Sequence, residues 1–150
     1  MLATASEERP DAAPSAVSVL LVEDNADDAE LALHGLSRCG LDSEVKWVRD
    51  GVEAMEWLDA GGAGTLRLLL LDLRMPRMDG FEVLRRLKGD PATRGIAVIV
   101  MVSAPDAPEL ERCFELGADA YLVKPLEAEP LRAALRDLNL RWGAGFNAGG

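Results

Sequence analysis

Two stretches of this chain are apolar almost without interruption, and they restrict the possible folds more than any other feature. They are residues 66–71 and residues 96–102, and both are rich in leucine or in β-branched side chains. A strand with water on one face alternates apolar and polar residues, whereas a strand covered on both faces does not. These two segments are therefore typical of central strands in a parallel sheet that has helices packed on each side.

Short strand-like segments and amphipathic segments alternate along the chain. The predicted strands are 17–22, 44–48, 66–71, 96–102 and 120–123. The predicted helices are 27–39, 50–61, 79–88, 106–117 and 127–140. Parallel neighbours need crossover helices, and such crossovers are right-handed. We therefore expect an α/β fold with a doubly wound, five-stranded parallel sheet, the flavodoxin-like strand order 2-1-3-4-5 and helices on both faces.

Two of the predicted helices carry a capping signal at their start. Asp50 and Asp106 are each followed, three residues later, by a glutamate. An acidic N-cap with glutamate at the third helical position is typical of a capping box. The pattern predicts helices that begin directly after Asp50 and Asp106.

Composition excludes several classes of protein. The 150 residues carry a net charge of −10, which argues against nucleic acid or an anionic membrane surface as a partner. One histidine and two cysteines are too few for a Cys/His zinc site or a disulfide framework, so we expect a cytoplasmic protein. Composition also predicts a disordered segment at 1–16, one domain at 17–142 and a flexible tail at 143–150.

Charged residues follow three of the predicted strands. Glu23 and Asp24 come after the first strand, Asp72 after the third and Lys124 after the fifth. In a doubly wound sheet these carboxyl ends line the binding crevice. Three carboxylates there would repel one another unless a cation offset them, and oxygen ligands suit Mg²⁺. A carboxylate, Mg²⁺ and a lysine together suit a phosphoryl group, and the aspartate can itself accept it.

Three separate motifs resemble those of response regulator receiver domains. They are LVEDN at 21–25, LDLRMPRMDG at 71–80 and GADAYLVKP at 117–125. The resemblance spans about residues 17–140. The run EDNADD at 23–28 is similar to phytochrome-associated single-domain regulators in particular.

The resemblance implies metal and phosphoryl ligands. Asp72 would be the phosphoacceptor, and Lys124 would contact the phosphoryl group and pair with Asp72. Asp24 would bind Mg²⁺ directly, together with Asp72 and the backbone carbonyl of Arg74, while Glu23 would act through water. We also consider that the Arg74 side chain shields the phosphoryl group from attacking water, or is simply a solvated loop residue.

The resemblance also implies two features of the last strand. Tyr121 would be the aromatic residue that changes rotamer on activation, unless it is only a half-buried strand residue. The bond between Lys124 and Pro125 would be cis, because an X–Pro bond prefers trans by only ~0.5–1 kcal/mol.

One position departs from the family pattern. Receiver domains carry a threonine or serine thirty residues after the phosphoacceptor and twenty-two before the lysine, and both counts lead to Val102. Valine has the shape of threonine but donates no hydrogen bond. Either Val102 occupies this switch position and weakens the switch, or Ser103 supplies the hydroxyl through a shift of the backbone.

These observations favour a single-domain response regulator that a sensor histidine kinase, such as a bacteriophytochrome, phosphorylates on Asp72. The alternative is a phosphorylation-independent interaction module that forms a homodimer through 106–117, 120–123 and 127–140, with Trp142 at the interface. We do not expect an enzyme beyond Mg²⁺-dependent self-phosphorylation and autodephosphorylation. An aspartate-based phosphatase would need a second Asp where Arg74 stands.

Overall fold

One parallel sheet organises residues 17–41, 44–75 and 77–138, which are the residues that this computed structural model describes. The strands are β2 (Val19–Val22), β3 (Val45–Val48), β4 (Leu68–Asp72), β5 (Ala97–Val102) and β6 (Ala120–Val123). Their order across the sheet is β3-β2-β4-β5-β6, and every neighbouring pair is parallel. In chain order this is 2-1-3-4-5, so the predicted fold class is confirmed.

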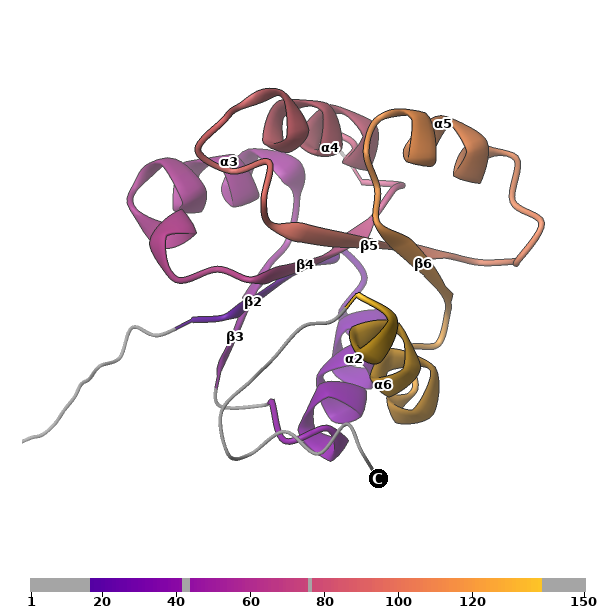
Figure 1. Cartoon of the computed structure of the whole chain (residues 1–150). Helices are drawn as coiled ribbons and strands as arrows, with labels where there is room; N and C mark the ends of the chain where they lie inside the picture. The colour runs from indigo at the N-terminus through magenta and orange to yellow at the C-terminus, as the bar shows by residue number, and fades with distance from the viewer. Residues whose placement is uncertain (1–16, 42–43, 76, 139–150) are drawn as a thin grey trace, which may run out of the picture.

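Helices cover both faces of the sheet (Figure 1). The α-helices are α2 (Ala26–Arg38), α3 (Gly51–Asp59), α4 (Gly80–Gly89), α5 (Glu109–Glu115) and α6 (Ala128–Asp137). A short 3-10 turn, η3 (Gly62–Gly64), follows α3. Helices α2 and α6 lie on one face, and α3, α4 and α5 lie on the other (Figure 1). The predicted terminal segments 1–16 and 143–150, and the end of the predicted domain at 139–142, lie outside the described residues.

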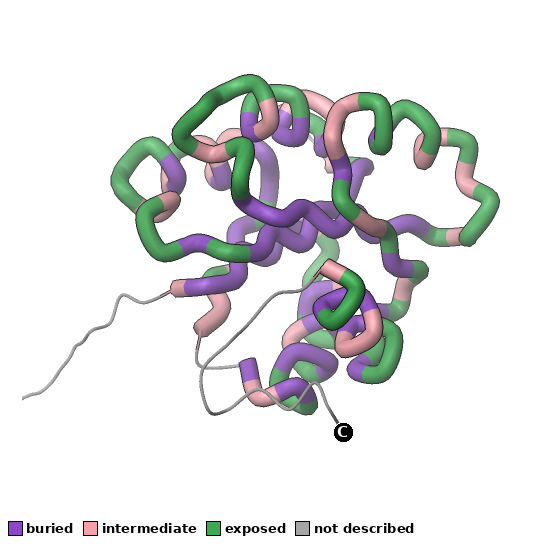
Figure 2. Tube along the Cα trace, in the orientation of Figure 1, coloured by how far each residue is buried: buried purple, intermediate pink, exposed green. Residues whose placement is uncertain are grey.

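The core has two halves because alternate residues of each buried strand point to opposite faces. Leu68 and Leu70 pack under α2 and α6, whereas Leu69 and Leu71 pack under α3, α4 and α5. The three central strands are buried along their whole length (Figure 2). Burying such a side chain contributes ~1.5–3 kcal/mol, so the apolar runs stabilise the sheet on both faces at once.

Side-chain caps determine where three of the helices begin. The side chains of Asn25, Asp50 and Asp79 accept the N–H groups of the residues three positions on, at 2.8, 2.8 and 3.0 Å. The predicted cap at Asp50 is therefore confirmed. Because Asn25 caps α2, the neighbouring Asp24 carboxylate is not used as a cap.

The predicted start of the fourth helix is wrong. Helix α5 begins at Glu109, and its N-cap, Pro108, makes no side-chain cap hydrogen bond. The chain first turns through an N–H donated by Ala107 to the carbonyl of Ala104, so Asp106 lies in a turn. The segment between β5 and α5 is therefore longer than predicted.

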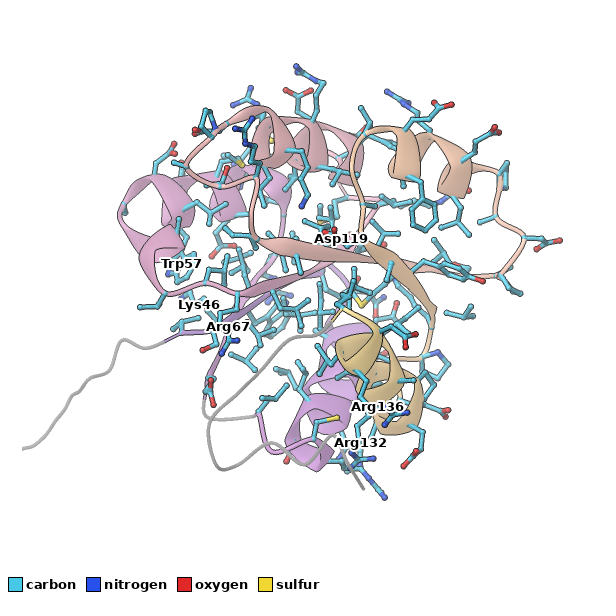
Figure 3. All side chains as sticks on the ribbon, in the orientation of Figure 1. Lys46, Trp57, Arg67, Asp119, Arg132 and Arg136 are labelled. Carbon is cyan, nitrogen blue, oxygen red and sulfur yellow. The ribbon has the colours of Figure 1, made fainter. Side chains whose placement is uncertain are left out.

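Polar contacts away from the site tie the elements together. At the start of β6, Asp119 accepts the ammonium group of Lys88 at 3.0 Å and the N–H of Val98 at 2.8 Å (Figure 3). On α6, Arg132 donates to the carbonyl of Arg38 at 2.7 Å and so joins α6 to α2 (Figure 3). Among the described residues, no helix has the length and apolarity that a membrane span requires.

Candidate phosphoacceptor and metal site

The carboxyl ends of two neighbouring strands bring the predicted acidic residues together. Glu23 and Asp24 directly follow β2, and Asp72 is the last residue of β4. One carboxylate oxygen from each of the three lies within 4.8 Å of the others. Glu23 and Asp72 are buried, and Asp24 is half-buried. The hydrogen-bonded pairing of β2 with β4 places these ends side by side.

Lys124, the residue after β6, is shared among several carboxylates. Its ammonium nitrogen lies 3.0 Å from Glu23 Oε1, 3.2 Å from Asp28 Oδ2 and 3.3 Å from Asp72 Oδ1. Asp28, in the first turn of α2, is a site residue that sequence reasoning missed. The sequence feature that could have indicated Asp28 is the pair of aspartates at 27–28, at the end of the run EDNADD at 23–28.

Burial and the charges of this cluster together shift the pKa values of Glu23 and Lys124. Burial is the main cause that raises the pKa of Glu23 from 4.5 to about 7, and the negative charge of Asp72 adds to it. Burial alone would lower the pKa of Lys124, but the charges of Asp72 and Glu23 outweigh it and raise that pKa. One lysine therefore does not fully offset the charge that the carboxylates would carry.

The donors present fit a hard cation such as Mg²⁺. Glu23 Oε1 is buried, and the Lys124 ammonium group that lies 3.0 Å from it is shared with Asp28 and Asp72. Several carboxylates that share one cation are unfavourable unless further positive charge or water reaches them. Carboxylate oxygens are ligands that Mg²⁺ and Mn²⁺ accept, with water molecules completing the coordination.

Hydrogen bonds to its side chain and its backbone hold Glu23 in place. The N–H of Asn25 donates to Glu23 Oε2 at 3.1 Å, and the indole N–H of Trp47 donates to the backbone carbonyl of Glu23 at 2.8 Å. Trp47 lies on the edge strand β3, opposite Leu21 in the register. The role of Trp47 was not foreseen, because the sequence does not show which way an edge-strand side chain points.

Val102 and Ser103 lie at the end of β5 but differ in surroundings. Val102 is 5% exposed and packs with Leu71 and Leu73 on the face of α3, α4 and α5. Asp72 stands between these two leucines, so its side chain points to the opposite face, where Lys124 contacts it. Ser103 is exposed and, with Asp72 and Val102, lines a pocket of about 460 Å³.

Other predicted residues surround this pocket or the last strand. The N–H of Arg74 donates to Asp72 Oδ1 at 3.4 Å, while its guanidinium group forms an ion pair with Glu109 at the start of α5. The ring of Tyr121 is partly exposed and lies edge-on to Phe114, with 6.4 Å between ring centres. The peptide bond between Lys124 and Pro125 is cis.

A phosphoacceptor-like acidic cluster at the end of a 2-1-3-4-5 sheet defines a class of protein, and the sequence agrees. The family model of the response regulator receiver domain matches residues 19–136, and the chain belongs to this family. The family named from the three motifs is therefore confirmed.

Bacteriophytochrome response regulators are among the similar proteins. The structure of AtBRR has a TM-score of 0.75 and 39% identity, and the match covers 87% of this chain and 97% of AtBRR. Rcp1 of Synechocystis is 31% identical over 128 residues, which are 83% of this chain and 87% of Rcp1. The structure of the Mn²⁺-bound form of Rcp1 has a TM-score of 0.64 and 30% identity, covering 87% of this chain and 96% of that one.

Proposed function

We propose that this protein is a response regulator whose Asp72 accepts a phosphoryl group from a partner histidine kinase. The observation that carries this proposal is the meeting of Glu23, Asp24, Asp72 and Lys124 at one end of the sheet. In the transfer, a carboxylate oxygen of Asp72 attacks the phosphorus of a phosphohistidine. An O–P bond forms, the N–P bond breaks, and the imidazole takes the electron pair and then a proton.

Each neighbour of Asp72 has a proposed task in this transfer. Glu23, Asp24, Asp72 and the carbonyl of Arg74 hold Mg²⁺, with Glu23 acting through water. When bound, Mg²⁺ offsets negative charge on the phosphoryl oxygens. The Mn²⁺-bound form of the similar protein Rcp1 supports a divalent ion in this family. Lys124 supplies a second fixed positive charge beside the acceptor oxygen.

We propose Ser103, and not Val102, as the hydroxyl that contacts the phosphoryl group. Spacing counted along the sequence points to Val102, but its side chain packs with Leu71 and Leu73 on the far face of the sheet. Ser103 is exposed in the pocket beside Asp72. A hydroxyl there can donate to a phosphoryl oxygen and draw the segment between β5 and α5 inward.

Membership of the family supports a proposal for the partner and for the signal. Receiver domains work with histidine kinases, and similarity to AtBRR favours a bacteriophytochrome as the kinase of this chain. The phosphorylated chain would act in the cytoplasm. The conformational change that follows phosphorylation would reach Tyr121 through the segment that joins β5 to α5.

A second candidate is an interaction module that does not depend on phosphorylation. Phe114, Tyr121 and Val123 are 44%, 37% and 37% exposed on α5 and β6, and they offer apolar area for a homodimer through α5, β6 and α6. Trp142, which sequence analysis placed at this interface, lies outside the described residues.

Hydrogen exchange separates the two candidates. The protein is incubated with Mg²⁺ and acetyl phosphate, and exchange of the amides in 103–108 is compared with that of Asp72→Asn treated in the same way. A phosphorylation-dependent switch predicts slower exchange in wild type alone, together with a change in elution volume if dimerisation follows. Unchanged exchange and unchanged elution in a protein that carries the phosphoryl group would favour the second candidate.

A further inference from the structure

We infer that Arg77 is a positioning residue for the metal site. Together with Asp50 it fixes the loop between β4 and α4, whose residue Arg74 offers its carbonyl to the cation. This inference rests on the proposed function, because it concerns how the same Mg²⁺ site is held in shape.

The contact between Arg77 and Asp50 is a two-point one. Both Nε and Nη2 of Arg77 donate to Asp50 Oδ2, at 2.9 and 2.6 Å. The Asp50 side chain is only 12% exposed, and its other oxygen accepts the N–H of Glu53 at the start of α3. Asp50 therefore stands on a fixed helix end and gives Arg77 a rigid anchor.

The backbone of Arg77 shows that the loop is held in an unusual shape. Its φ is +66°, a value that residues other than glycine rarely adopt. It is the only positive φ outside glycine among the described residues. A conformation of this kind persists when surrounding contacts hold it, and such residues cluster at functional sites.

Two further contacts define the position of this loop. At its base, the N–H of Gly80 donates to the carbonyl of Leu73 at 3.1 Å. On the α4 side of the loop, the carbonyl of Met78 lies so close to Gly51 that a Cβ on Gly51 would come within 2.4 Å of it. The loop is therefore closed at its base and packed against the start of α3 through Met78.

The anchored loop carries Arg74 directly beside Asp72. The N–H of Arg74 lies 3.4 Å from Asp72 Oδ1, and the Arg74 side chain is exposed and forms an ion pair with Glu109. The described contacts that position this stretch of backbone include those of Leu73, Met75, Arg77 and Met78. Loss of the contact between Arg77 and Asp50 would let the Arg74 carbonyl move away from the cation. The carboxylates of the site would keep their positions.

The test is a Mg²⁺ titration followed by intrinsic tryptophan fluorescence, since Trp47 donates to the carbonyl of Glu23. Arg77→Gly removes the ion pair and also relieves the positive φ. We expect the Kd for Mg²⁺ to rise about tenfold, as for residues that orient metal ligands. We expect only a small fall in Tm, because relief of the positive φ offsets part of the lost ion pair.

Two more variants sharpen this test. Asp50→Asn keeps a cap acceptor for α3 but loses the charge, so it should weaken Mg²⁺ binding in the same direction as Arg77→Gly. The double variant should be no weaker than the poorer single one, because both remove one interaction. Arg94→Gly, an equal charge change in an exposed turn, should bind Mg²⁺ like wild type.

The failures of this inference and of the proposed function differ. A Kd for Arg77→Gly within twofold of wild type would overturn the positioning role and leave the Mg²⁺ site standing. A fall in Tm with unchanged Kd would show that Arg77 only stabilises the fold, and would also overturn it. A wild-type protein that does not bind Mg²⁺ would overturn the proposed function itself.

Discussion

Val102 and Ser103 are neighbours at the end of β5, and we propose that this difference of one position decides which of them contacts the phosphoryl group. Both border the pocket beside Asp72, but the Val102 side chain packs in an apolar cluster whereas Ser103 is exposed. The spacing of the motifs favours Val102, but a shift of the backbone by one residue reverses the face and would bring Ser103 into its place. The packing of Val102 with Leu71 and Leu73 is the observation that favours Ser103 as the residue facing the phosphoryl group.

Ser103→Ala and Val102→Thr test this assignment together. A hydrogen bond to a charged group is worth ~1.5–3 kcal/mol, so Ser103→Ala should slow uptake of phosphoryl from acetyl phosphate by about tenfold or more. Val102→Thr should leave that rate within about twofold. It should lower the free energy of unfolding by ~1–3 kcal/mol, because its hydroxyl would be buried without a partner.

The rate is measured by intact mass over time, and stability by denaturant unfolding. A faster rate in Val102→Thr with an unchanged rate in Ser103→Ala would return the switch position to residue 102.

Sequence alone could predict Glu23, Asp24, Asp72 and Lys124 as a cluster, because the ends of parallel strands meet at one edge. It could not predict contacts made by residues elsewhere. Asp28, Trp47 and Arg77 reach the site or its loop from a helix, an edge strand and a turn. Their directions depend on how those elements pack, and no local pattern encodes that.

At the scale of elements, capping decides which carboxylates remain for chemistry. Asn25 caps α2 and Asp79 caps α4, so Asp24 and Asp72 are not consumed by helix ends. The sequence correctly predicted that α3 begins directly after its side-chain cap, Asp50. The prediction that a helix begins after Asp106 was wrong, because a turn closed by the N–H of Ala107 comes first and the local sequence pattern does not reveal it.

Helix α4 has an acid-sensitive surface contact. Glu82 binds Arg85 and Arg86, and these hydrogen bonds lower its pKa from 4.5 to about 2. A lowered pKa adds stability that is present above pH 4.5 and is lost as the pH falls through about 2. The difference in free energy of unfolding between wild type and Glu82→Gln should therefore shrink between pH 5 and pH 2.

Acid titration of both proteins by circular dichroism and urea unfolding measures this difference. Glu56→Gln is the matched control, since Glu56 is exposed on α3 and forms no ion pair with a described residue. A difference for Glu82→Gln that stays constant from pH 5 to pH 2 would mean that the contact adds nothing at neutral pH.

At the scale of the whole molecule, the fold followed from two kinds of pattern. Uninterrupted apolar runs identified β4 and β5 as central strands, and the alternation of strands with helices required parallel crossovers. Boundaries moved by one to three residues, because strand ends depend on the neighbouring strand more than on the segment itself. The same order places all the acidic strand ends at one edge, so fold and site were predicted together.

The central claim is that Asp72 accepts a phosphoryl group in a reaction that needs a divalent cation. The most direct measurement is the intact mass of the protein after incubation with Mg²⁺ and acetyl phosphate. The account predicts one added phosphoryl group on wild type and on the control Asp59→Asn, which alters an exposed aspartate of α3. It predicts none on Asp72→Asn, and none on wild type when Mg²⁺ is chelated. Equal addition to Asp72→Asn, or no addition to wild type with Mg²⁺ present, would contradict it.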